Sequence, residues 1–235
     1  MSTYREHKER PVTVRAKICG LRTAGAVDAA VAGGAAFVGF VFYPPSPRSI
    51  SPADAAALIA RVPDHIASVG LFVDPDDATI AAVLAVADLG MLQLHGAESP
   101  ERVAAIRAHF GLPVIKALPV AVAEDFAAVA DYADVCDWLL FDARPPKTAD
   151  ALPGGNALAF DWRLLGGRPV PLPWLLAGGL DPSNVADAVR LSGAAAVDVS
   201  SGVERAKGVK DPARIAAFLE ALRPTGVSAG DSAGA

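Results

Sequence analysis

The stretch VRAKICGLRTAGAVDAAVAGGAAFVGFVF, Val14 to Phe42, holds two short apolar runs separated by an alanine-rich segment. The first run, residues 14–20, and the second, residues 36–42, are rich in the aliphatic and aromatic side chains that favour strands. The segment between them is long enough for a helix. A strand, a helix and a second strand in that order predict a unit of a parallel sheet with helical crossovers.

The same alternation recurs along the chain. Further strands are expected at residues 67–73, 91–96, 113–119, 138–143, 174–180 and 195–202. Helices are expected at residues 23–34, 51–62, 74–87, 99–110, 121–133, 181–193 and 211–222. Several of these open with Ser or Asp followed by Pro, which is typical of a capped helix start.

Eight strands, each followed by a helix or a long loop, predict an α/β protein with a single (β/α)₈ TIM barrel. The strands read as near-continuous apolar runs, as strands buried on both faces do. An open doubly wound sheet is the structural alternative. It would normally carry a glycine-rich dinucleotide turn after the first strand, and CGLRTAG lacks that spacing.

Length and composition suit one domain of this kind. The chain has 235 residues, 52% of them hydrophobic, and a net charge of −5. We place the catalytic barrel at residues 13–223, between a disordered arm at 1–12 and a disordered tail at 224–235. No basic stripe or long apolar run is present, so we expect neither nucleic acid nor membrane as a partner. The chain has only two cysteines, Cys19 and Cys136, and such sparse cysteine favours a location in the reducing cytoplasm. Four scattered histidines support no metal site.

Polar side chains lie where the expected strands end, which is where such barrels carry their active sites. Cys19 ends the first strand, Arg48 follows the second, Asp142 closes the sixth and Asp198 lies on the eighth. Lys17 shares a face with Cys19, because strand side chains alternate with a period of two. If that face is inward, the strand brings a cation and a thiol together, and a buried lysine is rare unless it is paired or functional.

The turns after the seventh and eighth strands predict a phosphate site, because those loops often bind phosphate in such barrels. They hold glycine and serine residues that present backbone N–H groups with little obstruction: Gly178, Gly179, Ser200, Ser201 and Gly202. A short helix expected to begin at SGVE would add its positive end. Glycines that only make tight turns are the simpler alternative.

Taken together, these motifs resemble the phosphoribosylanthranilate isomerase family of tryptophan biosynthesis. The resemblance runs from about residue 14 to residue 219, in order. It is carried by KICGLRT, GFVFYPPSPRSISP, GLFVD, LQLHGAE, IKAL, LLFDA, LAGGLDPSNV and VDVSSGVERAKGVKD.

The resemblance implies an Amadori rearrangement of N-(5′-phosphoribosyl)anthranilate to 1-(2-carboxyphenylamino)-1-deoxyribulose 5-phosphate. It assigns the general base to Cys19, the general acid to Asp142 and recognition of the anthranilate carboxylate to Arg48. It implies a phosphorylated small-molecule substrate, no metal or organic cofactor, and a monomer or homodimer. The alternative is a non-catalytic sugar-phosphate-binding barrel, which would need neither Cys19 nor Asp142.

The proposed chemistry sets further expectations. Ring opening needs a proton, so Asp142 must start in its protonated form. Lys17 lowers the thiol pKa, or pairs with an inward carboxylate such as Asp198, and the two roles are compatible. Asp198 is expected to orient a ribose hydroxyl or the base. His95 is expected to support packing and hydrogen bonding.

The loop after the sixth strand, residues 143–156, is long and rich in Pro and Gly, which is consistent with a lid over the substrate. The family usually has Gly-Gly-Thr-Gly here. This chain has Asn156 and Ala157 in the last two places, which puts the closure of the lid in doubt.

Overall fold

The predicted strands close into one barrel. The structure, a computed structural model, describes residues 14–144 and 159–223. Each strand pairs in parallel with the next, and the last pairs with the first. The strands are β1 (Arg15–Cys19), β2 (Phe37–Val41), β3 (Ala67–Phe72), β4 (Met91–Leu94), β5 (Val114–Val120), β6 (Trp138–Ala143), β7 (Trp174–Leu176) and β8 (Ala196–Val199). The (β/α)₈ barrel is thereby confirmed, and the open sheet is excluded.

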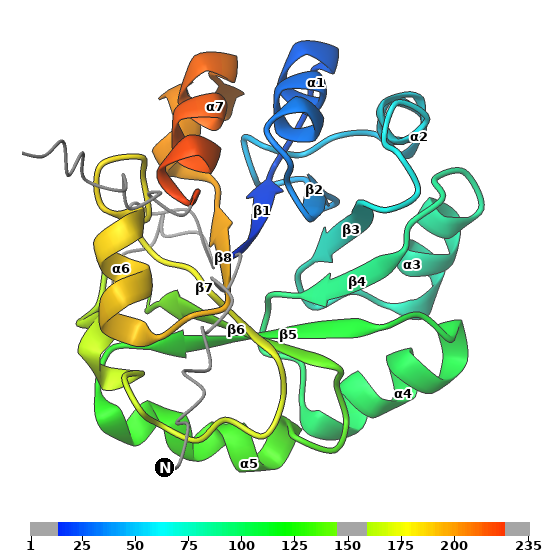
Figure 1. Ribbon diagram of the computed structural model, residues 1–235. Helices are drawn as coiled ribbons and strands as arrows, with labels where there is room; N and C mark the ends of the chain where they lie inside the picture. Colours follow the sequence, from blue (N-terminus) through cyan, green and yellow to red (C-terminus); the bar gives the residue numbers. More distant parts are fainter. Residues whose placement is uncertain (1–13, 145–158, 224–235) are drawn as a thin grey trace, which may run out of the picture.

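Helices lie outside the ring of strands (Figure 1). They are α1 (Ala24–Ala32), α2 (Pro52–Ile59), α3 (Asp77–Leu84), α4 (Pro100–Phe110), α5 (Val129–Tyr132), α6 (Val185–Ser192) and α7 (Pro212–Ala221). Three 3₁₀ turns, η1 (Ala123–Ala128), η2 (Trp162–Leu164) and η3 (Ser201–Val203), and a hairpin of β9 (Glu204–Ala206) and β10 (Val209–Lys210) complete the described elements. Within the described ranges, no helix has the length and apolar character needed to cross a membrane.

Three helices begin at the predicted caps. The side chains of Ser51, Ser99 and Asp211 accept hydrogen bonds from backbone N–H groups two or three residues ahead, at 3.1, 3.3 and 2.9 Å. Proline occupies the first turn in each case. This arrangement satisfies N–H groups that a helix leaves without an internal partner.

Two other predicted starts are wrong by two or more residues. Asp74 does not cap α3; it has a φ of +47° and accepts a hydrogen bond from the backbone N–H of Ala97 at 2.7 Å, so Asp76 caps the helix instead. Asp181 makes a turn with Ser183, at 2.7 Å, and α6 starts later, at Val185.

The predicted helix over residues 121–133 is mostly 3₁₀, with a single α-turn at its end. The carboxylate of Asp125 accepts hydrogen bonds from the backbone N–H groups of Ala121 and Val122, at 2.7 and 3.0 Å. These bonds fix the chain in a tight turn as it leaves β5. The predicted arm and tail, and nearly all of the predicted lid, lie outside the described residues.

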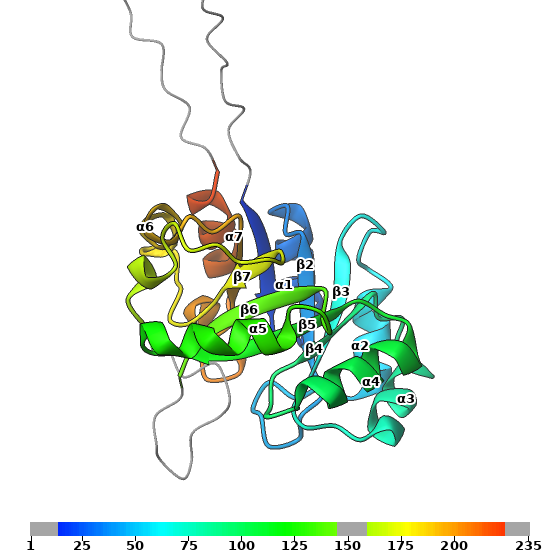
Figure 2. The same ribbon diagram turned by 90° about the horizontal axis from the view of Figure 1, so that it is seen from below.

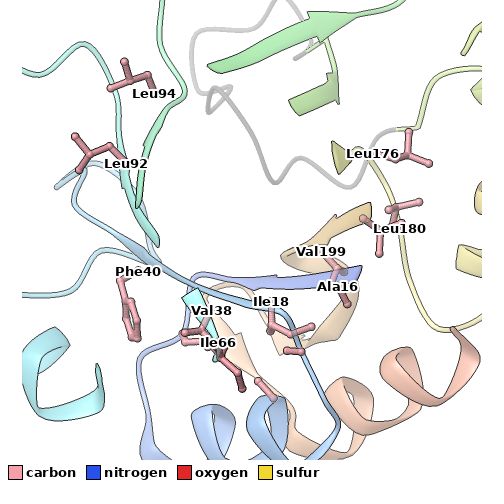
Figure 3. Packing of buried hydrophobic residues seen from close by; sticks show 14 of the residues in the cluster. Ala16, Ile18, Val38, Phe40, Ile66, Leu92, Leu94, Leu176, Leu180 and Val199 are labelled. Carbon is pink, nitrogen blue, oxygen red and sulfur yellow. The ribbon is translucent and has the colours of Figure 1, made fainter. Parts of the chain in front are cut away.

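Strand alternation divides the core in two. Even-numbered residues of β1 and β2, such as Ile18 and Val38, point outward toward the helices (Figure 3). Inward residues, including Phe37, Leu140 and Leu175, fill the barrel. On β1 the inward positions are Arg15, over the Phe37 ring at one mouth of the barrel, and the buried Lys17 and Cys19, so the first strand delivers polar groups to the interior.

The first and last helices, α1 and α7, pack against each other outside the ring of strands. Figures 1 and 2 show α7 near α1, and the pair is in contact. A side chain at Gly33, the residue after α1, would overlap the Leu219 methyl group on α7. The two helices therefore pack closely beside the pairing of β1 with β8.

Candidate active site

Lys17 and Cys19 share the inward face of β1, as strand parity predicts. Lys17 is fully buried, and its Nζ donates to Asp198 Oδ1 at 2.8 Å, across the pairing of β1 with β8. On the other side, Gly39 of β2 lies opposite Cys19. A Cβ at Gly39 would lie 3.0 Å from the sulfur and 3.1 Å from Lys17 Nζ. The glycine therefore makes room for both groups.

Burial raises the pKa of the Cys19 thiol above its ordinary value, and the nearby Lys17 ammonium opposes this without overcoming it. Burial alone would lower the pKa of Lys17, but Asp198 and Cys19 outweigh it, and the net direction is upward. The predicted pairing of Lys17 with Asp198 is present, and the position of the ammonium beside Cys19 acts to lower the thiol pKa against the larger effect of burial.

Asp142 closes β6 and is nearly buried. Its Oδ1 accepts the backbone N–H of Ala143 at 2.9 Å, and its Oδ2 lies 3.3 Å from Nε2 of His95. The other ring nitrogen of His95, Nδ1, lies 2.8 Å from the Gln93 amide nitrogen. The contact between His95 and Asp142 was not predicted. The sequence showed only that Gln93 and His95 stand two residues apart at the end of β4, which suggests a shared face but does not name a partner on β6.

Arg48 lies in the loop after β2, where its guanidinium is nearly buried. It donates to both carboxylate oxygens of Glu204, from Nε at 2.7 Å and from Nη2 at 3.1 Å. Lys210 donates to the same carboxylate at 2.8 Å. Glu204 and Lys210 were not predicted as site residues, because a hairpin after the last strand has no sequence signal that predicts which loop it will contact.

The predicted phosphate loops adjoin each other. Gly178 and Gly179 have φ of +85° and +65°, and a Cβ at Gly178 would lie 2.7 Å from the backbone nitrogen of Ala143. A Cβ at Gly202 would overlap the carbonyl oxygen of Leu180 in the loop after β7. The loop after β7 therefore lies against the end of β6 on one side and the loop after β8 on the other.

The loop after β8 also reaches β1. Ser200 donates from its hydroxyl to the Cys19 carbonyl at 3.2 Å, and Lys210 donates to the Ser200 carbonyl at 2.8 Å. The short helix expected to begin at SGVE is present as η3, which opens at Ser201 but is a single 3₁₀ turn. The contacts nevertheless run without a break from Asp142 through both loops to Cys19.

The second thiol lies elsewhere. Cys136 precedes β6, and burial raises its pKa to about 11. It hydrogen-bonds the Tyr132 carbonyl at 3.2 Å and behaves as a small apolar side chain. In the part of the chain that the structure describes, no group of three or more His, Cys, Asp or Glu side chains is placed to hold a metal ion.

The chain is similar along most of its length to proteins of one known family. A family model described as N-(5′-phosphoribosyl)anthranilate (PRA) isomerase matches residues 16–221. The relative named N-(5′-phosphoribosyl)anthranilate isomerase in Paramagnetospirillum magneticum is 58% identical over 210 residues, covering 89% of this chain and 97% of that protein. The same-named protein of Paracoccus denitrificans is 59% identical over 208 residues, covering 88% and 96%.

Solved structures of the same family are also similar to this chain. Phosphoribosyl anthranilate isomerase from Thermotoga maritima has a TM-score of 0.79 and 36% identity, covering 89% of this chain and 98% of that one. A phosphoribosyl anthranilate isomerase in complex with reduced 1-(o-carboxyphenylamino)-1-deoxyribulose 5-phosphate has a TM-score of 0.76 and 34% identity, with the same two coverages. This chain therefore belongs to the N-(5′-phosphoribosyl)anthranilate isomerase family and is an isomerase of tryptophan biosynthesis.

Proposed function

We propose that Cys19 and Asp142 are the general base and general acid of the rearrangement. Family membership favours the enzyme over the alternative of a non-catalytic binding barrel. The observation that carries the assignment is the unbroken rim of contacts from the Asp142 backbone through the two glycine-containing loops to Cys19. A sugar phosphate bound at those loops would have the acid on one side and the base on the other.

In the first step, the Asp142 carboxylic acid gives its proton to the furanose ring oxygen. The bond from that oxygen to the anomeric carbon breaks, and the nitrogen lone pair forms the imine. The Cys19 thiolate then removes the proton on C2′, and the electron pair moves into the imine to give an enolamine. The enolamine tautomerises to the ketone, so the overall reaction is an isomerisation with no external reactant.

The surroundings of the thiol suit this role. A thiolate is required, and burial opposes it by raising the pKa of Cys19. Lys17 offsets part of that effect, and Asp198 keeps Lys17 beside the sulfur. We therefore assign Asp198 to orienting the base through Lys17, which is one of its two predicted roles. Turnover is expected to rise with pH as the thiolate forms.

Substrate recognition follows from the same rim. We assign the anthranilate carboxylate to Arg48, whose planar group Glu204 holds in a fixed orientation. We assign the phosphate to Gly178, Gly179, Ser200, Ser201 and Gly202. The reaction as written uses only side chains and needs no metal or organic cofactor.

We also propose that the protein is a monomer or a homodimer and that it is located in the cytoplasm. The residues assigned to chemistry all lie on one barrel, so a monomer or a homodimer would be competent. A solved structure with a TM-score of 0.75 to this chain is of generated monomers of the dimeric phosphoribosylanthranilate isomerase from Thermotoga maritima. Cys19 and Cys136 are both free thiols, which is consistent with a reducing cytoplasm.

The test is turnover of freshly prepared N-(5′-phosphoribosyl)anthranilate, followed by loss of fluorescence, in the wild type and in the Cys19→Ser and Asp142→Asn variants. Each variant is expected to lose on the order of 10²–10⁴-fold in kcat, the usual contribution of a positioned acid or base. Binding of a product analogue should be retained. If either variant turns over substrate at the wild-type rate, that residue does not have its assigned role.

A further inference from the structure

Gln93 is the fully buried polar residue beside the proposed acid. Its amide nitrogen lies 2.8 Å from Nδ1 of His95, and Nε2 of His95 lies 3.3 Å from Asp142 Oδ2. The side chains of His95 and Asp142 are 9% and 11% exposed, so water does not readily compete for these contacts. Three side chains therefore form a line from the barrel interior to the acid.

The chemistry of the amide decides which ring nitrogen carries the proton. An amide NH₂ only donates, so the nitrogen that faces it, Nδ1, must be the acceptor. A neutral imidazole then carries its proton on Nε2. Nε2–H in turn points to an acceptor, the Asp142 oxygen.

The orientation of the Gln93 amide decides the tautomer of His95. In the present orientation the amide nitrogen faces Nδ1, and the Gln93 carbonyl oxygen is buried with no hydrogen-bond partner among residues 14–144 and 159–223. Turning the amide over would place the carbonyl oxygen against Nδ1, which would then have to carry the proton. The choice of tautomer therefore depends on Gln93.

We propose that Gln93 is a positioning residue that fixes His95 as the Nε2–H tautomer, so that His95 donates a hydrogen bond to Asp142. The catalytic consequence rests on the proposed role of Asp142. With its free lone pair occupied by Gln93, His95 has no site for the Asp142 proton. That proton goes to the substrate ring oxygen, and the carboxylate left behind accepts hydrogen bonds from His95 and from the Ala143 backbone.

The tautomer can be measured directly. Long-range ¹⁵N NMR spectra of imidazole-labelled protein are recorded above the titration of free histidine, without substrate, and His95→Gln identifies the His95 signals among the four histidines. We expect Nε2 at the protonated shift and Nδ1 at the unprotonated shift. The reverse pattern would overturn the proposal whether or not Cys19 and Asp142 are catalytic.

Two substitutions at Gln93 then separate polarity from shape. Gln93→Met keeps the length of the side chain but neither donates nor accepts through an amide. In its ionised form Gln93→Glu only accepts, so it forces a proton onto Nδ1. We expect the Glu variant to show protonated Nδ1 and a kcat roughly tenfold below that of the Met variant, with KM little changed. Equal kcat in the two variants would mean that Gln93 only fills space, and would overturn the positioning role.

Discussion

Gly39 is the residue on which the spacing of the site depends. It has no chemistry of its own, yet a Cβ at this position would lie only 3.0 Å from the Cys19 sulfur and 3.1 Å from the Lys17 ammonium. Strand β2 therefore contributes space to the site, because Gly39 has no side chain to fill it. A glycine in a strand interior often marks such a close approach.

Gly39→Ala should reduce kcat and cost about 1–3 kcal/mol of stability, because the added methyl must displace the thiol or the ammonium. Steady-state turnover and urea denaturation measure the two effects. Gly90→Ala is the matched control, since its Cβ would meet only backbone atoms at ordinary distances, 3.7 Å and beyond. A Gly39→Ala enzyme as active and as stable as the control would contradict this account of the site.

Lys17→Met should move the ascending pH limb of kcat to higher pH. The general base acts as a thiolate, and Lys17 lowers the thiol pKa against the larger effect of burial. Removing the cation therefore raises the pKa further. Turnover measured across the alkaline range tests this.

The single variant also leaves Asp198 buried without its partner, which typically costs about 3–5 kcal/mol. The double variant Lys17→Met, Asp198→Asn avoids an unpaired charge and should show a smaller shift in the same direction, because the Asp198 charge itself raises the thiol pKa. A limb that moved in neither variant would show that Lys17 does not act on the thiol.

At the scale of elements, the hairpin of β9 and β10 ties the end of the barrel to the loop after β2. Glu204 at the start of β9 accepts from Arg48, from Lys210 and from the backbone N–H of Gly208 at 3.0 Å. One buried carboxylate thus joins two loops that are more than a hundred residues apart in sequence. This linkage positions Arg48 at the rim.

Glu204→Gln should destabilise the protein near neutral pH, and the difference from wild type should shrink in acid. Burial alone raises the pKa of Glu204, but Arg48 and Lys210 outweigh it, so the pKa in the folded state is lowered. A lowered pKa gives stability that is present above the unfolded value of about 4.3 and is lost as pH falls through the folded value. Urea denaturation at pH 7 and at lower pH measures this.

Glu220→Gln, in an exposed pair with Arg223, is the control and should change little at either pH. A Glu204→Gln deficit that stayed constant from neutral to strongly acid pH would mean that the charge of Glu204 contributes nothing to folding.

The sequence predicted which segments form strands and most of those that form helices, but it did not predict some of their boundaries, for physical reasons. Ser51 and Ser99 cap helices because local hydrogen bonds suffice. Asp74 carries the same signal, but its carboxylate bonds to the loop after β4, a contact of long sequence separation. In the site, the alternation of side chains along β1 predicted that Lys17 and Cys19 lie on the same face. The partners Glu204 and Gly39 come from other strands and loops, so only the folded chain brings them into place.

At the scale of the whole molecule, the described barrel is complete between β1 and α7. Pairing of β1 with β8 and contact of α1 with α7 close it, and the family match spans residues 16–221. A protein of residues 13–223 should therefore fold cooperatively and keep wild-type turnover. Thermal unfolding and the fluorescence assay test this. A loss of activity without loss of folding would give the terminal segments a role that the proposed site does not contain.

The alternation along β1 has a consequence for how this enzyme tolerates length changes. Its five residues serve two surfaces at once, with Ala16 and Ile18 in the outer apolar layer and Lys17 and Cys19 inside. Inserting one residue between Lys17 and Cys19 would place the ammonium and the sulfur on opposite faces of the strand, because side chains alternate with a period of two. The thiol would then lose the cation beside it, so the two-residue spacing of Lys17 and Cys19 is fixed by the geometry of the strand.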